Sequence, residues 1–304
     1  RAATVLVSDE AAGVIRRIDA TTLTPLPPIA VGKRPRGLAL SPDGRRLYVA
    51  VSDENRVAVV DVAAAREVAS LPSGPDPETI ALAPDARRLY VANEDDSLLS
   101  VIDIASGKRV AEVPVGGEPE GTAVSPDGAL IIQASEAASL AHVIDANSLK
   151  VIDNLLVDTR PRHIAFTPDG RQFWVSSEVR GSISLFDTAS RRLLGRIALT
   201  SLAPDAPADR AVQAVGIVFT PDGRRAYVAL GRAGLVAEID AQSLKLLRRF
   251  TVGWRAWQVA LSADGSRLFT ANGLSGDISS VDLATGRTTS IATGGRPWGV
   301  VVAP

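Results

Sequence analysis

Short apolar runs alternate with polar turns along the whole chain, a pattern that indicates strands rather than helices. Gly37-Leu38-Ala39-Leu40 leads into the turn Ser41-Pro42-Asp43-Gly44, and Leu47-Tyr48-Val49-Ala50 leaves it. A third run ends at Asp61, and a fourth covers residues 67–71. Because Pro, Asp and Gly favour tight reversals of the chain, each such unit is predicted to form four short antiparallel strands.

This turn recurs along the chain and defines a repeat. The second residues of successive copies are 42, 42, 42, 53, 42 and 41 residues apart. A period near 42 without helical patterning is the length of one four-stranded propeller blade. The copies are Ser41-Pro42-Asp43-Gly44, Ala83-Pro84-Asp85-Ala86, Ser125-Pro126-Asp127-Gly128, Thr167-Pro168-Asp169-Gly170, Thr220-Pro221-Asp222-Gly223, Ser262-Ala263-Asp264-Gly265 and a truncated Ala303-Pro304.

The two ends of the chain fit together as one further blade. Gly299-Val300-Val301-Val302 has the pattern of an innermost strand with no partner strands after it, whereas Val5-Leu6-Val7-Ser8 matches the second strand Val49-Ala50-Val51-Ser52. Pairing the two ends leaves no exposed edge there. We therefore predict an all-β fold with a single domain over residues 1–304. It is a seven-bladed β-propeller of four-stranded antiparallel blades, closed by pairing of the N- and C-terminal strands in one blade.

Two further positions recur in every repeat, and both are interpreted as structural. The third strand ends in an Asp, whose carboxylate can accept hydrogen bonds from the backbone of the following turn. The third position of the innermost strand is small or β-branched between bulky neighbours, as expected where strands converge on a channel. The aspartates are Asp19, Asp61, Asp103, Asp145, Asp187, Asp240 and Asp282, and the small positions are Ala39, Ala81, Ala123, Ala165, Val218, Ala260 and Val301.

Composition narrows the classes of function. The formal net charge is −1, so no general basic field attracts nucleic acid. No apolar run approaches the roughly 20 residues that span a bilayer. Cysteine is absent, which excludes disulfides, thiolate metal sites and a cysteine nucleophile. The start at Arg1-Ala2-Ala3-Thr4 is interpreted as a trimmed chain that has lost an export signal.

The second strands carry a family resemblance. Tyr48-Val49-Ala50, Tyr90-Val91-Ala92-Asn93 and Phe269-Thr270-Ala271-Asn272 resemble the Tyr-Val-Thr-Asn repeat family of seven-bladed propellers, over the whole chain. Segments that differ between repeats, such as Glu118-Pro119-Glu120-Gly121 and Arg296-Pro297-Trp298-Gly299, are similar to the subgroup associated with catabolism dependent on pyrroloquinoline quinone (PQQ). The resemblance implies export to the periplasm and an accessory role, and it supplies no catalytic motif.

The loops that enter the innermost strands differ from blade to blade, although the strands around them repeat. They are expected to surround one end of the channel, so their last residues form what we call the channel-mouth ring. Arg296 stands two residues before the last member. The ring consists of Arg36, Glu78, Glu120, Arg162, Val215, Trp257 and Trp298.

Two interpretations of this ring remain open. In the first, Arg36 pairs with Glu78 and Arg162 pairs with Glu120 between neighbouring blades, and the tryptophans plug the channel. In the second, the arginines grip a carboxylate and the tryptophans stack on a planar ligand. The predicted ligand-binding residues are then Arg36, Glu78, Glu120, Arg162, His163, Trp257, Arg296 and Trp298.

Other candidate chemistry is weak. The loops between second and third strands are acidic, but their carboxylates are spread over five blades without a calcium-binding spacing, so a solvated acidic rim and no metal site are expected. His142 and His163 are too few for a histidine metal site, and no Gly-x-Ser-x-Gly elbow frames a serine. The acidic residues are Asp9, Glu10, Asp53, Glu54, Glu94, Asp95, Glu136 and Glu178.

The 53-residue spacing contains an insertion at 200–210 in the channel-mouth set of loops. It is interpreted as a lid, a partner contact or a tolerated surface insertion.

The sequence thus favours a non-enzymatic periplasmic binding or docking propeller that serves PQQ-dependent alcohol oxidation. Its partner would be a small anionic or aromatic ligand, or a periplasmic protein, and no cofactor is expected. One alternative is a lactonase-type hydrolase, because seven-bladed propellers also host that chemistry. Another is a pure interaction scaffold. The absence of a recognisable acid–base set argues against the enzyme.

Overall fold

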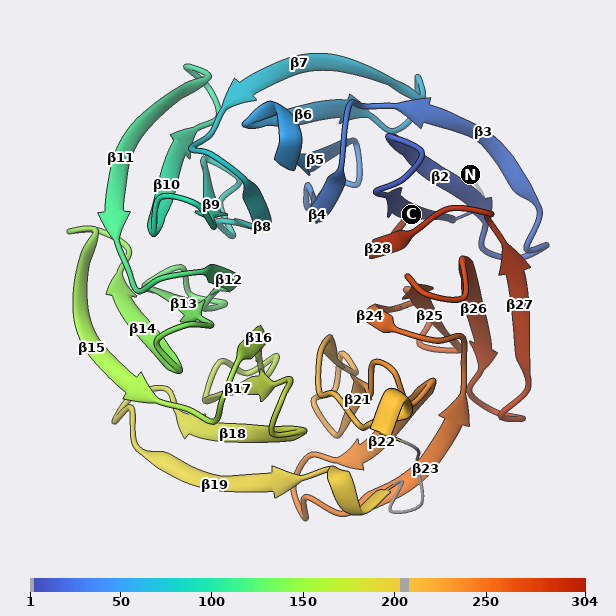
Figure 1. Ribbon diagram of the computed structural model, residues 1–304. Coiled ribbons are helices and arrows are strands. Elements are labelled where there is room, and N and C mark those ends of the chain that lie inside the picture. Colours follow the sequence, from blue (N-terminus) through green and yellow to red (C-terminus); the bar gives the residue numbers. More distant parts are fainter. Residues whose placement is uncertain (1–2, 203–207) are drawn as a thin grey trace.

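Seven four-stranded antiparallel sheets form a ring around a central channel (Figure 1) in the computed structural model, which describes residues 3–202 and 208–304. Each sheet is one blade, with its strands in order from the channel to the rim. The predicted all-β, seven-bladed propeller is confirmed. The described residues contain no helix with the length and apolar character of a membrane span.

The closing blade contains β28 (Pro297–Ala303), β1 (Thr4–Asp9), β2 (Val14–Asp19) and β3 (Pro25–Ala30), from the channel outward. The second blade contains β4 (Pro35–Leu40), β5 (Arg46–Val51), β6 (Arg56–Asp61) and β7 (Arg66–Pro72). The third contains β8 (Pro77–Leu82), β9 (Arg88–Asn93), β10 (Leu98–Asp103) and β11 (Lys108–Pro114). The fourth contains β12 (Pro119–Val124), β13 (Leu130–Ser135), β14 (Leu140–Asp145) and β15 (Lys150–Leu156). The fifth blade contains β16 (Pro161–Phe166), β17 (Gln172–Ser177), β18 (Ser182–Asp187) and β19 (Leu193–Ala198). The sixth contains β20 (Ile217–Phe219), β21 (Arg225–Ala229), β22 (Leu235–Asp240) and β23 (Leu246–Thr251). The seventh contains β24 (Ala256–Leu261), β25 (Arg267–Asn272), β26 (Asp277–Asp282) and β27 (Thr288–Ala292). Short 3₁₀ turns occur at Ser52–Glu54, Thr200–Leu202 and Ala208–Arg210.

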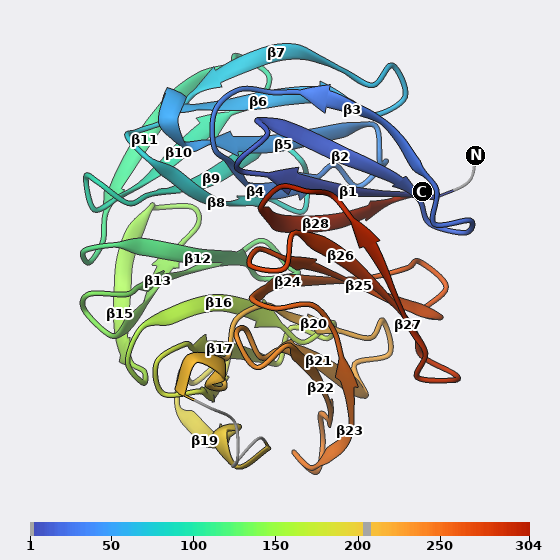
Figure 2. The ribbon, with the colours of Figure 1, turned by 45° about the vertical axis from the view of Figure 1, so that its right-hand side comes forward.

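The ring is closed by strands from the two ends of the chain. β28 pairs antiparallel with β1, and Val302 lies opposite Val5 in this pairing. The backbone N–H of Gly299 also donates to Ser8 Oγ at 2.8 Å. Figure 2 shows the two strands side by side. The predicted shared blade is therefore confirmed.

The recurrent aspartates act as expected. In all seven blades, the Asp at the end of the third strand accepts hydrogen bonds from backbone N–H groups two or three residues later. These bonds hold the turn on the face opposite the channel mouth.

The small position of each innermost strand makes room for the next blade. Ala39 belongs to a buried cluster with Ile80, and Leu82 packs against the same cluster. The same relation holds for Ala165 with Ile217 and Phe219 of the following blade. Because blades converge towards the channel, a methyl group on one strand faces two bulky side chains on the next. The side chain is therefore small because of the neighbouring blade.

Replacing Ala39 by leucine should lower the free energy of unfolding by about 1–3 kcal/mol, because the added atoms overfill the contact with Ile80. Urea denaturation would measure this change. The matched control is Ala69→Leu on the exposed face of β7, where the same change should stay within about 0.5 kcal/mol. Equal effects at the two sites would contradict the packing argument.

Candidate functional site

The start of each innermost strand directs the channel-mouth ring into the mouth. Arg36, Glu78, Glu120 and Arg162 are each the second residue of their strand, directly after a proline. A proline is tolerated at a first strand position because its missing N–H is not needed in the ladder. The pairing with the second strand shifts register at this point in these four blades. Such bulges turn a side chain out of the regular pleat.

The acidic loops dock onto the same ring through backbone hydrogen bonds. The N–H of Glu136 donates to the carbonyl of Glu118 at 2.9 Å, and that of Glu178 donates to Arg160 at 2.8 Å. Glu118 and Arg160 have φ values of 53° and 62°. This left-handed conformation turns each carbonyl towards the neighbouring loop. The docking brings the second set of loops against the first around the mouth.

The expected solvated acidic rim is therefore wrong for part of the acidic set. Asp9 is fully buried, and Glu136 and Glu178 are each 4% exposed. Arg16 Nε donates to Asp9 at 3.0 Å, whereas both glutamates face the ring residue Arg162. Spacing along the chain could not show that the loops fold inward.

Arg36 is the centre of one ion-pair network. Its Nε donates to Glu10 Oε1 at 2.5 Å, and its Nη1 pairs with Glu78 Oε2. Arg34 adds a second cation, 2.7 Å from Asp76 and 3.3 Å from Glu78. The Glu78 side chain is fully buried between the two arginines. The predicted pair between Arg36 and Glu78 is thus present.

Arg162 is the centre of a second, more deeply buried network. Its side chain is 6% exposed and lies 2.7 Å from Glu120, 3.4 Å from Glu178 and against Glu136. Arg255 joins the network at 2.7 Å from Glu178. These pairs are buried, unlike exposed ion pairs, which contribute only about 0–1 kcal/mol each. Breaking a buried pair leaves a charge without a partner inside the protein.

Glu78 and Glu120 hold the most perturbed carboxyl groups of the mouth. Burial raises the pKa of Glu120 to about 7, against the lowering effect of Arg162. Burial, followed by the negative charge of Glu120, also raises the pKa of Glu78 well above its usual range. Two neighbouring carboxyl groups in a dry site titrate as a pair and retain a proton near neutral pH. Such a pair can accept and donate protons at neutral pH.

Aromatic rings cover the rest of the mouth. Trp257 and Trp298 have ring centroids 5.9 Å apart. The guanidinium of Arg36 lies 5.6 Å from the ring centroid of Trp298, and that of Arg255 lies 3.8 Å from the ring centroid of Trp257. Trp298 is 2% exposed. Trp298 is therefore packed into the closure of the mouth, and Trp257 lies beside it half-buried.

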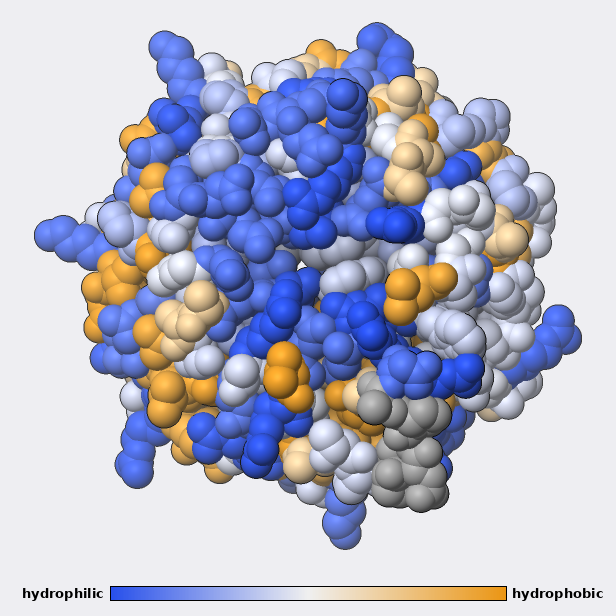
Figure 3. Space-filling view, in the orientation of Figure 1, coloured by the Kyte–Doolittle hydropathy of each residue, from blue (hydrophilic) through white to orange (hydrophobic). Residues whose placement is uncertain are grey.

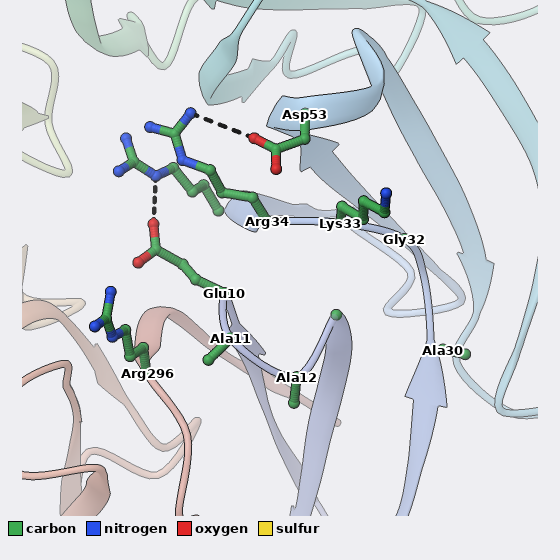
Figure 4. A pocket seen from close by; sticks show the side chains of 11 residues that line it. Glu10, Ala11, Ala12, Ala30, Gly32, Lys33, Arg34, Asp53 and Arg296 are labelled. Carbon is green, nitrogen blue, oxygen red and sulfur yellow. Dashed lines mark hydrogen bonds and ion pairs between the residues drawn. The ribbon is translucent and has the colours of Figure 1, made fainter.

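A hollow of about 730 Å³ opens beside the Arg36 network (Figure 4). Lys33, Arg34, Arg36 and Arg296 line it, together with the acidic residues Glu10 and Asp53 and the small residues Ala11, Ala12, Gly13, Ala30 and Gly32. Arg296 forms no ion pair within the described residues, and its side chain points into the same space as Glu10 in Figure 4. In Figure 3, hydrophilic residues surround this central part of the face. The hollow can receive a polar ligand.

The two histidines lie in different environments. His142 is a structural residue of β14, where its Nε2 accepts from the Gly116 N–H at 2.9 Å and its Nδ1 lies 2.5 Å from Asn154. His163 lies beside Arg162, as predicted, and lines a smaller chamber of about 170 Å³ inside the channel. Burial lowers the pKa of His163 to about 4, so its imidazole is neutral at pH 7.

The predicted ligand-binding residues thus divide into three groups. Arg36, Glu78, Glu120 and Arg162 form the two networks, Trp257 and Trp298 cover them, and Arg296 lines the hollow while His163 lines the chamber. The sequence interpretation missed Glu10, Glu136, Glu178 and Arg255 as members of the networks. It also missed Thr79 and Gln258 as lining residues of the chamber. Both occupy the same position in their repeats as His163, so an alignment of the repeats at this position could have identified them.

One acidic cluster has the spacing of a cation site. Asp76, Glu78 and Glu94 can place a carboxylate oxygen each within 4.8 Å of one another. The Arg34 guanidinium already pairs with two of these carboxylates, at 2.7 Å from Asp76 and 3.3 Å from Glu78. Within the insertion at 200–210, Thr200–Leu202 and Ala208–Arg210 form 3₁₀ turns. Residues 203–207 lie outside the described residues, so the interpretation as a lid, a partner contact or a tolerated surface insertion stays a prediction.

Comparison with known proteins gives two family matches, neither of which covers half of the chain. Residues 157–294 match the family described as lactonase, 7-bladed β-propeller, and residues 43–161 match the cytochrome D1 heme domain. Among curated protein sequences, none matches significantly.

Solved structures share the fold at low sequence identity. The periplasmic gluconolactonase of Pseudomonas aeruginosa is 20% identical over 99% of both chains, with a TM-score of 0.81. A candidate 6-phosphogluconolactonase from Bacteroides uniformis is 18% identical over 99% of this chain and 100% of its own, also with a TM-score of 0.81. Kuenenia stuttgartiensis hydrazine synthase is 22% identical over 95% of this chain and 92% of its own, with a TM-score of 0.77.

These findings overturn the expectation of a non-enzymatic propeller accessory to PQQ-dependent alcohol oxidation. The lactonase family match and the lactonases among the similar structures support the hydrolase alternative instead. The error has a physical origin. The alignment already placed Glu78 and Glu120 on neighbouring blades, but only the folded structure shows the burial that raises their pKa values and gives them acid–base character.

Proposed function

We propose that this protein is a hydrolase that opens lactone rings at the channel mouth. The observation that carries the proposal is the match to the lactonase family over residues 157–294, a segment that includes Arg162, Glu178 and Arg255 of the second network. The neighbouring carboxyl groups of Glu78 and Glu120 supply the proton chemistry that such a reaction needs.

Hydrolysis of a lactone requires activation of water and stabilisation of an oxyanion. Water attacks the carbonyl carbon and gives a proton, directly or through a second water, to the Glu78–Glu120 pair. The negative charge that develops on the carbonyl oxygen is stabilised by the Arg36 guanidinium, which contacts Glu78 and lines the hollow. The ring C–O bond then breaks, and the leaving alkoxide takes back the proton. The product is a hydroxy acid.

The hollow favours a lactone that carries an anionic group. Lys33, Arg34, Arg36 and Arg296 outnumber its two acidic lining residues, and Arg296 has no carboxylate partner within the described residues. An arginine without a partner is suited to bidentate binding of a carboxylate or phosphate. The proposed small anionic ligand is therefore the substrate itself.

Replacing Arg296 by alanine should raise KM for 6-phosphogluconolactone about tenfold, with little change in KM for uncharged glucono-δ-lactone. The reason is that only the phosphorylated substrate has a group for Arg296 to bind. Initial rates at several substrate concentrations give both constants. Arg192→Ala, at an exposed residue in the turn just before β19, is the matched control for loss of one positive charge. Equal changes for both lactones would exclude this anion site.

The proposal as a whole is tested by hydrolysis of a panel of γ- and δ-lactones by the purified protein. Acid release in a pH-stat, corrected for spontaneous opening, should exceed the uncatalysed rate by several orders of magnitude for at least one anionic lactone. No excess over the uncatalysed rate across the panel would exclude the function.

We also propose that the enzyme acts in the periplasm. One similar structure is named as a periplasmic gluconolactonase, and this supports the location implied by the family resemblance. We further propose that the chain belongs to the Tyr-Val-Thr-Asn repeat family, a proposal that is supported by its second-strand motifs alone.

A further inference from the structure

The central channel contains a second cavity, separate from the hollow at the mouth. This chamber of about 170 Å³ is lined by residues of the innermost strands. Its polar wall consists of Thr79, Thr122, His163, Gln258 and Trp298, and none of its lining residues is an acid, a lysine or an arginine. At neutral pH the His163 imidazole is uncharged as well. The chamber therefore offers hydrogen-bonding groups without a formal charge of its own.

The repeat position that follows the channel-mouth ring builds this wall. Its polar residues Thr79, His163 and Gln258 fall on alternate blades, and glycine occupies the blades between them. At Gly121, an added Cβ would lie 2.8 Å from the carbonyl oxygen of Arg162 in the next blade. Gly37, Gly121 and Gly216 each let the polar residue of the next blade approach the channel, whereas Gly299 is followed around the ring by Gly37. The glycines are Gly37, Gly121, Gly216 and Gly299.

The chamber has a surplus of N–H donors. The indole Nε1 of Trp298 is buried and has no hydrogen-bond partner among the described residues. His163 Nδ1 accepts from the Ile217 N–H at 3.2 Å, so the neutral ring carries its proton on Nε2. Neither that Nε2 nor the Gln258 amide forms a hydrogen bond in the part of the chain that the structure describes. A buried donor without a partner is costly, so a ligand is expected to satisfy Trp298 Nε1, with His163 Nε2 and the Gln258 amide as further donors in the same wall.

Hydroxyl groups in the same wall are already committed. Thr79 donates to the carbonyl of Glu120, and Thr122 donates to Gln133 Oε1 at 2.5 Å. A water molecule would bring two further O–H donors, for which Gln258 Oε1 is the side-chain amide acceptor in the wall. An anion needs donors only, and the site presents the N–H groups of Trp298, His163 and Gln258.

The surroundings favour one negative charge. Arg36 and Arg162 lie in the ring next to the chamber, while burial raises the pKa of Glu78 and Glu120 and so reduces the negative charge that opposes them. A volume of 170 Å³ corresponds to about five or six water molecules at ~30 Å³ each. One small ion such as chloride, bromide or formate fits this space with several water molecules beside it.

We propose that the chamber bounded by Trp298, His163 and Gln258 is a binding site for a small monovalent anion, of the halide or carboxylate class. The proposal stands independently of the hydrolase function, because none of these three residues takes part in the proposed reaction.

Bromide is the probe for the test. Crystals of the full chain soaked in sodium bromide should show an anomalous peak within hydrogen-bond distance of Trp298 Nε1 and His163 Nε2. In solution, bromide titrated at constant ionic strength should raise Tm in a saturable manner. Trp298→Phe retains the ring but removes the N–H donor, and it should weaken the bromide affinity about tenfold.

Trp257→Phe is the matched control, because this neighbouring tryptophan of the ring does not line the chamber. Its bromide affinity should equal that of the parent. A chamber that holds water alone in the soaked crystal, or equal affinities in the two variants, would overturn the proposal. Formate should compete with bromide for the same site, and failure to compete would remove the carboxylate class.

Discussion

Replacing Arg162 by alanine is expected to lower the free energy of unfolding by about 3–5 kcal/mol. The guanidinium is 6% exposed and faces Glu120, Glu136 and Glu178, whose side chains are 5% exposed or less. Without it, three buried carboxyl groups lose their shared cation. Guanidinium chloride denaturation, followed by tryptophan fluorescence, measures the loss.

Arg160→Ala is the matched control. Arg160 contacts the same Glu136, at 2.7 Å, but its side chain is 49% exposed. Its loss should therefore cost only about 0–1 kcal/mol. The effect of Arg162→Ala should also shrink as the pH falls, because protonated carboxyl groups need no cation. Similar losses for the two arginines, or a loss that does not vary with pH, would show that the buried network is not the cause.

Replacing Glu120 by glutamine should lower kcat/KM for lactone hydrolysis by about 10²- to 10⁴-fold, the usual contribution of a general base. Glutamine preserves the shape of the side chain but cannot accept a proton. Initial rates on the best lactone of the panel measure the change. Glu118→Gln, an exposed glutamate two residues away, is the matched control and should retain the parent rate.

The pH dependence distinguishes a base from a structural residue. Because the pKa of Glu120 is raised to about 7, kcat/KM of the parent should rise as the pH increases through 7 and then level off. The stability should change in the opposite direction. A raised carboxyl pKa makes the folded state more stable at low pH, and this contribution is lost as the pH rises from about 4.5 to 7. Glu120→Gln should abolish the change in rate and remove the contribution of Glu120 to the change in stability, while that of Glu78 remains. An unaltered rate profile in this variant would exclude Glu120 as the base.

The sequence was sufficient to predict the fold because the fold is periodic. A turn that recurs every 42 residues fixes the blade, and the match between residues 5–8 and 49–52 fixes the phase of the first strand. The same alignment identified Arg36, Glu78, Glu120 and Arg162 as neighbours around the mouth. Register and circular order follow from such a repeat without knowledge of any side-chain contact.

The chemistry of the site was less accessible, because it depends on how loops from different blades pack. From the sequence, Glu136 and Glu178 are expected to be solvated. They are buried because their loops dock onto the backbone carbonyls of Glu118 and Arg160. The raised pKa of Glu120 is likewise a consequence of burial. An acidic residue in a polar loop has the same local sequence whether it is solvated or buried.

Pairing of β28 with β1 also has a consequence for the biosynthesis of the protein. Gly299 and Ser8, which are hydrogen-bonded in the closing blade, are 291 residues apart. During synthesis on the ribosome, the channel-side edge of β1 stays unpaired until the six intervening blades have been synthesised. An unpaired strand edge is a template for association with other chains. Between the synthesis of the first and the last strand, the nascent chain therefore depends on chaperones, or on fast completion, to keep that edge free for its own C-terminal strand.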